Sequence, residues 1–270
     1  MYSGHMALVT CFLALLIGNQ TAAPVQNQVS LRFNPPVGKT YQFKMTVKMQ
    51  MGAVAGGPAM EFQTDMDSDM KVVSRTGDVT TMETKFSKAH VTLPEDSPIA
   101  AMKESLEKQS NDKTVTSKID GFYHVQGVNG SGMDSMINGM QAMSFPDHAI
   151  KVGDDWSYSM DLGKMIAAGG NAVPGAPSVE ASGKIPIKFR LKEITQKGNQ
   201  TFANIEITMD GDAKMSVSGQ EIEMHIKSTG TQQIEVSTGM TVGTSMVSDT
   251  TSTFGDMKMT QHLVQSMVLR

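Results

Sequence analysis

The sequence predicts a mainly β protein in which long antiparallel strands form one strongly curved sheet, or half-barrel, built from two related units. Three observations lead to this prediction. Residues 41–51 alternate strictly between apolar and polar side chains, the same pattern returns at residues 152–162, and further alternating runs separated by turn signals follow each copy. Successive side chains of a strand point to opposite faces, so the alternation indicates strands with one dry face and one wet face.

The two copies align without a gap when residues 152–162 are placed on residues 37–47. The turn segments 73–80 and 194–201 then correspond as well. We expect a single duplicated domain over residues 24–270, with a first unit over about 29–128, a helical insert over about 131–143 and a second unit over about 150–270. The alignment superposes three inward positions: Trp156 on Tyr41, Tyr158 on Phe43 and Met160 on Met45.

The first unit begins with a short alternating strand within residues 29–33, which Pro35 and Pro36 stop. The strand 41–51 leads through a Gly-rich loop to a strand over 62–72, a turn at 76–78 and a return strand over 79–93, whose parity slips near Lys88 as at a bulge. A capped helix is expected from Ser97 to about Gln109. A hairpin through Asp120-Gly121 then joins 114–119 to 122–128.

The second unit follows an amphipathic helix expected over about 131–143, where Met133, Met136, Ile137 and Met140 share one face. We expect about two helices in all, packed on or near the concave face of the sheet. A strand begins near residue 155, and a long loop spans 163–183. Alternating strands follow at 185–191, 203–209 and 221–227. Further strands are expected at 232–236, 241–254, which is rich in Thr and Ser, and 257–269, whose apolar residues on both parities predict a strand covered on both sides.

Residues 1–23 are predicted to be a signal peptide, because the apolar run 7–18 is too short to span a bilayer and small and polar residues follow it. The protein is therefore expected to be exported from a bacterium, to the periplasm or beyond. The only cysteine, Cys11, lies in this segment, so the mature chain would contain no disulfide. A net charge of −4 gives no basic face for nucleic acid, and no later stretch could span a membrane.

The sequence contains no catalytic constellation, and we expect neither an enzyme, a cofactor nor a metal site. None of the six histidines has zinc-ligand spacing to another ligand residue. His148 is interpreted as a loop residue. Asp65, Asp67 and Asp69 alternate on one strand face, a pattern compatible with calcium binding. A solvated face that resists edge pairing explains them better.

Methionine is abundant: the chain has 24. Nearly all occupy apolar positions of strands or helices, which indicates a core or a pliable hydrophobic cavity, because methionine adapts to irregular apolar shapes. We predict that the concavity is lined by Tyr41, Phe43, Met45, Met136, Met140, Trp156, Tyr158 and Met160. A second interpretation is copper(I) binding by thioether groups, at the pairs Met49/Met51, Met133/Met136, Met140/Met143, Met224/His225 and Met257/Met259.

Four short motifs carry a resemblance to a group of secreted bacterial proteins classed as a domain of unknown function. They are Pro-x-Val-Gly-Lys-Thr-Tyr-x-Phe at 35–43, Gly-Phe-Tyr-His-Val at 121–125, Val-Gly-Asp-Asp-Trp at 152–156 and Ile-Glu-Val-Ser-Thr-Gly at 234–239. The resemblance covers about Leu31 to Phe254 and implies bacterial export. More distantly, the expected fold is similar to the half-barrels of periplasmic lipoprotein carriers and mycobacterial lipid-binding lipoproteins. Cys11 departs from that comparison, because it does not fit a lipidation site.

The preferred function is non-catalytic binding of a lipid or another apolar small molecule in the cell envelope. The first alternative is a structural or assembly protein whose concavity is filled by its own side chains, and the second is methionine-based copper binding. The sequence names no protein partner.

Overall fold

The computed structural model describes residues 27–52, 59–94, 97, 100, 103–111, 113–129, 144–163, 179–217, 220–255 and 257–270. The predicted signal peptide and the predicted helix over 131–143 lie outside the described residues. The strands are β1 (Gln28–Val29), β2 (Thr40–Met51), β3 (Met60–Thr76), β4 (Val79–Thr92), β5 (Thr114–Ile119), β6 (Val125–Asn129), β7 (Ile150–Lys151), β8 (Asp155–Asp161), β9 (Val179–Ser182), β10 (Lys184–Lys197), β11 (Gln200–Val217), β12 (Gln220–Glu235), β13 (Met240–Phe254) and β14 (Met257–Leu269).

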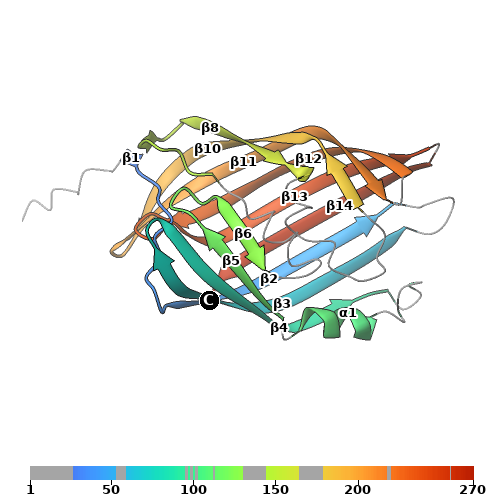
Figure 1. Cartoon of the computed structure of the whole chain (residues 1–270), viewed down its shortest axis with the longest axis horizontal. Helices are drawn as coiled ribbons and strands as arrows, with labels where there is room; N and C mark the ends of the chain where they lie inside the picture. The colour runs from blue at the N-terminus through green and yellow to red at the C-terminus, as the bar shows by residue number, and fades with distance from the viewer. Residues whose placement is uncertain are drawn as a thin grey trace, which may run out of the picture.

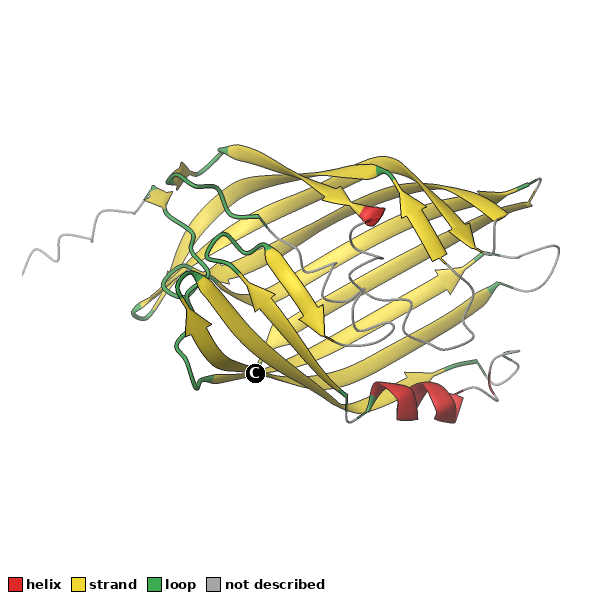
Figure 2. Ribbon diagram, in the orientation of Figure 1, coloured by secondary structure: helices red, strands yellow, loops and turns green. Residues whose placement is uncertain are grey.

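Twelve of these strands form one antiparallel sheet that does not close on itself, which confirms the predicted class of fold. The strand order is β6-β5-β4-β3-β2-β14-β13-β12-β11-β10-β8, and β9 pairs with β11. The sheet is long and curled, and its two ends approach each other at one end of the molecule (Figure 1). Figure 2 shows that strands make up most of the described chain. β1 and β7 form a separate two-stranded ribbon.

Two meanders meet in the middle of the sheet. β2 to β6 run outward to one edge in chain order, and β8 to β14 run inward from the other edge. The meanders join where β14 pairs with β2, with Gln265 opposite Val47 and Met267 opposite Met45. The first and last strands of this sheet in chain order, β2 and β14, therefore lie side by side at its centre.

The two meanders begin with the same turn. Gly38 and Gly153 both have positive φ, 85° and 94°, in Val-Gly turns. Gly38 N–H donates to the carbonyl of Val72 at 2.8 Å, and Gly153 N–H donates to that of Leu191 at 2.7 Å. Each acceptor directly precedes a shift of register in its strand. A duplication would place such contacts at matching positions, and the duplication stays a prediction.

Local features of the first meander agree with the sequence in detail. The expected bulge lies at Lys88, which has φ of 53°, beside a register shift between Asp65 and Asp67. The expected hairpin is present as β5 and β6. The strand expected within residues 29–33 is shorter, because only β1 pairs, with β7. Leu31 and Phe33 are buried without being part of a strand.

The helix α1 (Lys103–Ser110) falls within the segment where the first helix was predicted, but it lies beside the edge of β4 and not on the concave face. Glu107 accepts a hydrogen bond from Val91 N–H, and Asn111 accepts one from Ala89 N–H, each at 2.8 Å. These side chains occupy donors of β4 beyond the end of its pairing with β5. Among the described residues, no helix has the length and apolar character needed to cross a membrane.

One end of the curled sheet is closed by the segment that precedes β2. Phe33 N–H donates to Gly121 in the β5–β6 turn at 2.9 Å, and Asn34 N–H donates to Thr238 in the β12–β13 turn at 2.8 Å. The ring of Phe33 packs edge-on against Tyr123, with 4.6 Å between ring centroids. This segment therefore links the edge hairpin to the middle of the sheet and fills the space between them.

Candidate functional site

In the described strands, the inner face of the sheet carries one charged side chain, Arg75 near the end of β3. Arg75 follows the register shift after Val72, pairs with the buried Thr80 and donates a hydrogen bond to the carbonyl of Pro35. Directly paired residues share a face, and one such row runs Ile205, Gln232, Thr244, Met267, Met45 across five strands. The face comprises the odd positions of β2, β11, β14 and β10 up to Leu191, and the even positions of β3 up to Val72, β8, β12 and, from Thr244, β13. Apart from Arg75, the charged side chains of these strands therefore lie on the outer face.

A cavity of about 50 Å³ lies on the inner face near the closed end. Apolar side chains dominate its wall, and methionines are the commonest of them. The lining residues are Phe43, Met70, Tyr123, Ile187, Phe189, Ile207, Met209, Gln232, Met240, Thr241, Thr244, Met246, Gln265 and Met267. A space of this size holds a small group and not a whole lipid.

Four uncharged polar side chains and one phenol reach this cavity. Gln232 donates a hydrogen bond to the hydroxyl of Thr241, and the Tyr123 hydroxyl lies 3.5 Å from the same oxygen. Burial raises the pKa of Tyr123, so the phenol stays protonated and neutral. Gln265 and Thr244 complete the polar part of the wall.

The predicted lining residues are on the inner face wherever the structure describes them. Tyr41, Phe43 and Met45 of β2 are buried, and Phe43 reaches the cavity. On β8, Met160 is buried, whereas Trp156 and Tyr158 are half-buried at the edge of the sheet. Met136 and Met140 lie outside the described residues. The sequence did not single out the lining residues from β10 to β14.

Burial of the inner face decreases from the closed end toward the opposite end. Phe43 and Met45 are each 1% exposed. Further along the same strand, Met49 and Met51 are only half-buried. Apolar side chains of the neighbouring strands show the same half-burial: Met215, Ile222, Met224, Ile226, Phe254, Met259 and Leu263. An apolar surface thus continues from the cavity along the sheet.

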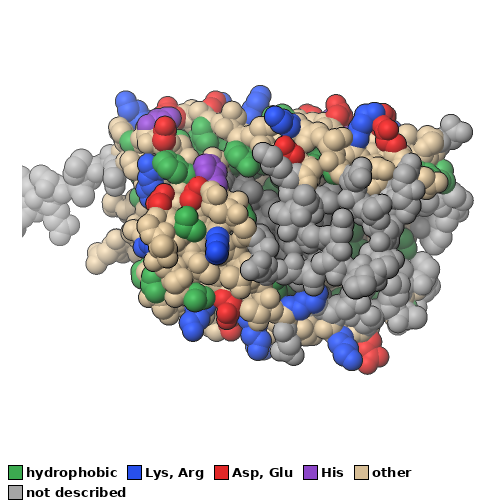
Figure 3. Space-filling model, viewed as in Figure 1, with side chains coloured by type: hydrophobic (Ala, Val, Ile, Leu, Met, Phe, Trp, Pro, Cys, Tyr) green, Lys and Arg blue, Asp and Glu red, His purple; other side chains and the backbone are tan. Residues whose placement is uncertain are grey.

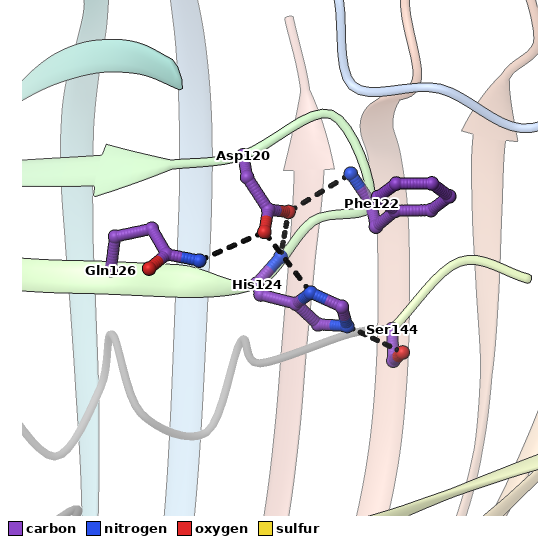
Figure 4. Close-up of polar contacts among 5 residues, drawn as sticks. All are labelled: Asp120, Phe122, His124, Gln126 and Ser144. Atoms are coloured by element: carbon purple, nitrogen blue, oxygen red, sulfur yellow. Dashed lines mark hydrogen bonds and ion pairs between the residues drawn. The ribbon is translucent and has the colours of Figure 1, made fainter. Parts of the chain in front are cut away.

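A cluster of polar contacts ties the two edges of the sheet together, and we call Asp120, His124, Ser144 and Trp156 the clasp. Asp120 accepts hydrogen bonds from the backbone N–H groups of Phe122 and His124, each at 2.9 Å (Figure 4). The ring of His124 bridges outward: Nδ1 lies 3.1 Å from Asp120 Oδ2, and Nε2 lies 2.8 Å from Ser144 Oγ. Trp156 of β8 donates to the carbonyl of Ser144 at 2.7 Å.

Ring contacts reinforce the clasp. His124 stacks on Tyr158 of β8, with 6.0 Å between centroids. Burial alone would raise the pKa of Asp120, but the hydrogen bonds and charge of His124 lower it. The residues involved come from the β5–β6 turn, the segment before β7, and β8. The clasp therefore joins the β5–β6 and β8 edges of the sheet, between which no strand pairing occurs in the described residues.

The contacts Ser144–His124–Asp120 have the order found in serine hydrolases. A hydrolase also needs backbone donors for the oxyanion, usually including the residue after the serine. Here Phe145 N–H donates to the carbonyl of Phe122 at 2.8 Å and is occupied. Sequence reasoning missed this cluster, since His124 and Ser144 are 20 residues apart and no local pattern links them.

The outer face carries paired charges and amides. Asp65 accepts hydrogen bonds from Thr46 and Gln63, which lower its pKa, and Asp69 accepts one from Gln42 at 3.1 Å. On the face shown in Figure 3, charged side chains of both signs are interspersed along the upper and lower margins. In the part of the chain that the structure describes, no group of three or more His, Cys, Asp or Glu residues could hold a metal ion.

The fold separates the two side chains of one pair considered for copper binding and places others together on the inner face. Met224 and His225 are adjacent on β12 and point to opposite faces, so they cannot share an ion. Met49, Met51 and Met259 are on the inner face. The pairs at 133/136 and 140/143 lie outside the described residues.

The structure therefore defines a mainly β protein with a curled, open sheet and a largely uncharged inner face. No family model matches the sequence, and no curated protein matches it. Among solved structures, similarity is recorded to lipovitellin in a study of its lipid–protein interactions, with a TM-score of 0.48, 8% identity, and coverage of 88% of this chain and 25% of that one. The chain thus spans a quarter of lipovitellin.

Two bacterial proteins of known structure are similar over 87% of the chain. An outer membrane channel of Pseudomonas putida F1 gives a TM-score of 0.29 with 10% identity and 96% coverage of its own chain. The attachment invasion locus protein of Yersinia pestis gives 0.17 with 8% identity and 100% coverage. Scores this low establish no family, and the functional argument depends on the residues of this chain.

Proposed function

We propose that this protein is exported to the cell envelope and binds a lipid or another apolar ligand on its inner face, without catalysing a reaction. The observation that carries the proposal is the half-buried apolar surface that continues from the cavity along the sheet. Burying that surface under an apolar ligand would be favourable by about 25 cal/mol for each Å² removed from water.

The cavity of about 50 Å³ must widen for a ligand to enter, and its wall is suited to this. Met70, Met209, Met246 and Met267 line it, and unbranched methionine side chains can change rotamer at low cost. Phe43 and Phe189 give the wall fixed shape beside these mobile groups. The structural alternative, a concavity filled by its own side chains, needs no such widening.

Native mass spectrometry of the full chain, purified without detergent, separates the proposal from both alternatives. We expect a co-purified apolar species that organic extraction removes. A bound copper ion at one equivalent would support the methionine site instead. A protein that carries nothing and takes up no lipid after extraction would support the structural role.

Neighbouring substitutions on β13 test the inner face directly. Met246→Glu places a carboxylate in the cavity wall, whereas Ser245→Glu places one on the exposed outer face. We expect Met246→Glu to abolish uptake of the neutral dye N-phenyl-1-naphthylamine, and Ser245→Glu to leave it unchanged. Circular dichroism must show that both variants are folded. Equal dye binding by the two would contradict an inner-face site.

A further inference from the structure

On β11 to β14, the polar side chains of the inner face are all hydroxyls and carboxamides. On β13 the inward positions after Thr244 include Ser248, Thr250 and Ser252, and the facing positions of β14 include Gln261 and Gln265. These groups can donate and accept hydrogen bonds but carry no charge. The inner face therefore has an uncharged polar stripe along β13 and β14, beside the apolar side chains.

Part of this stripe is already satisfied within the protein. Ser228 donates to Ser248 at 2.7 Å, and Gln261 points its amide nitrogen at the sulfur of Met49. Gln265 and Thr244 differ: both line the cavity, and no hydrogen bond joins either side chain to another described residue. A carboxamide and a hydroxyl on adjacent strands are thus available at one cavity.

Charge complementarity limits what those groups can bind. A carboxylate moved into this cavity would lose its hydration without gaining a cation, because the lining side chains contain no Lys, Arg or His. A hydroxyl, ester or amide group would instead exchange water for Gln265 and Thr244 at little cost. The wall therefore favours an uncharged polar group over an anionic one.

Apolar side chains suited to contact with an alkyl tail continue from the cavity in one direction. From Gln265 the inward side chains of β14 run through Leu263 and Met259 to Met257, with half-buried Met224 and Ile226 on β12. Since a strand rises about 3.3 Å per residue, the eight residues from Gln265 to Met257 span roughly 26 Å. That length accommodates a long alkyl chain.

We propose that the ligand is an uncharged amphiphile whose hydroxyl, ester or amide group hydrogen-bonds to Gln265 and Thr244 while its alkyl chain follows β14. This inference rests on the proposed function, since it specifies the chemical class of ligand for the same inner-face site. It distinguishes neutral lipids, such as monoacylglycerols, from fatty acid anions of the same chain length.

The test compares 1-monopalmitoylglycerol with palmitate at pH 7.5, below their aggregation concentrations, by displacement of N-phenyl-1-naphthylamine from the delipidated full chain. We expect the monoacylglycerol to bind about tenfold more tightly. Gln265→Leu should weaken monoacylglycerol binding about three- to tenfold. The matched control is Ser266→Ala, the next residue on the outer face, which should change nothing.

A reversal of preference gives the sharpest result. Gln265→Lys places a cation in the cavity, and we expect it to favour palmitate over the monoacylglycerol. Equal affinity of the wild type for the two lipids, or unchanged affinities in both Gln265 variants, would overturn the inference while leaving apolar binding intact. Failure of the wild type to bind the dye and both lipids would overturn the proposed function itself.

Discussion

The guanidinium group of Arg270 makes a bidentate contact with the carboxylate of Asp67. Nη1 donates to Oδ2 at 3.0 Å, and Nη2 lies 2.7 Å from Oδ1. The backbone N–H of Arg270 also donates to the carbonyl of Gln42 at 2.9 Å, and Lys88 approaches Asp67 Oδ2 at 3.1 Å. These contacts connect Arg270 to both β2 and β3, next to the pairing of β14 with β2 that joins the two meanders.

Replacing Asp67 by Asn should lower the free energy of unfolding by about 1 kcal/mol at pH 7, because a two-point charged contact becomes a weaker neutral one. Urea unfolding measures this. The control is Asp69→Asn, an exposed carboxylate that accepts a hydrogen bond from Gln42, for which we expect a change below about 0.5 kcal/mol. Equal effects of the two substitutions would contradict the special role of Asp67.

The Asp67 contact should also depend on pH. Burial alone would raise the pKa of Asp67, but Lys88 and Arg270 lower it overall. A carboxyl group with a lowered folded-state pKa stabilises the protein above its unfolded pKa of about 3.9, and this stabilisation is lost as the pH falls through the folded value. The difference between wild type and Asp67→Asn should therefore shrink below about pH 4.

Gly38→Ala and Gly153→Ala should each destabilise the protein by about 1 kcal/mol. Both glycines have φ near +90°, where a side chain is strained although nothing lies within 4 Å of the missing Cβ. Gly127→Ala is the matched control, because its surroundings are equally open and its φ is not positive. Thermal unfolding should separate the first two from the third. An unchanged melting temperature for either glycine variant would contradict a backbone conformation at that turn that requires glycine.

Local patterns predicted much of the first meander, because period-2 alternation and turn residues act over a few positions. The alternating run 41–51 predicted β2 and its last residue, Met51, correctly. The slip of parity near Lys88 predicted the bulge. The pairing of β14 with β2 was not predictable in this way. Nothing in either strand specifies its partner, and the choice depends on how the whole chain packs.

The candidate site was predicted in part. The inward side of β2 was identified because its own alternation shows it, but Gln232, Thr244 and Gln265 were overlooked in favour of the methionines. A sequence pattern could have identified them, because each is a polar residue at an inward position of a strand whose inward positions carry no charge. The packing position of α1 could not be predicted from the sequence. It depends on Glu107 and Asn111 accepting hydrogen bonds from backbone N–H groups of β4, which are distant in sequence.

His124→Leu should destabilise the protein by about 1–3 kcal/mol, because it leaves Asp120 and Ser144 without the ring nitrogens that join them. Trp156, the only tryptophan, reports the change, and its emission should shift toward that of exposed indole as the clasp loosens. His148→Leu is the control, since that exposed ring contacts only Asp147. Unchanged emission and stability in His124→Leu would show that the clasp contributes nothing.

Ser144→Ala tests whether the clasp has a catalytic role. We expect the wild type to show no hydrolysis of p-nitrophenyl butyrate above background and no labelling by a fluorophosphonate probe, because Phe145 N–H is already bonded. Ser144→Ala should then differ from the wild type only by a small loss of stability. Hydrolysis that disappears in both Ser144→Ala and His124→Leu would contradict the non-catalytic assignment.

Tyr41→Phe should raise the free energy of unfolding by about 1 kcal/mol. The hydroxyl of Tyr41 is buried with no hydrogen-bond partner in the described structure, and removing an unsatisfied polar group relieves its desolvation cost. Burial and the nearby charge of Glu235 raise the pKa of Tyr41 to about 12. Since this exceeds the unfolded value of about 10, the wild type should lose stability as the pH rises from 10 through 12.

The Tyr41→Phe variant should lack that part of the alkaline loss, because it has no proton to release at this position. Tyr158→Phe is the control, because this ring is half-buried at the edge of the sheet. Removing its hydroxyl should change the free energy of unfolding by less than about 0.5 kcal/mol. Denaturant unfolding at pH 7 and pH 10.5 measures both effects. If Tyr41→Phe is instead destabilised at pH 7, the hydroxyl must form a hydrogen bond within the folded protein.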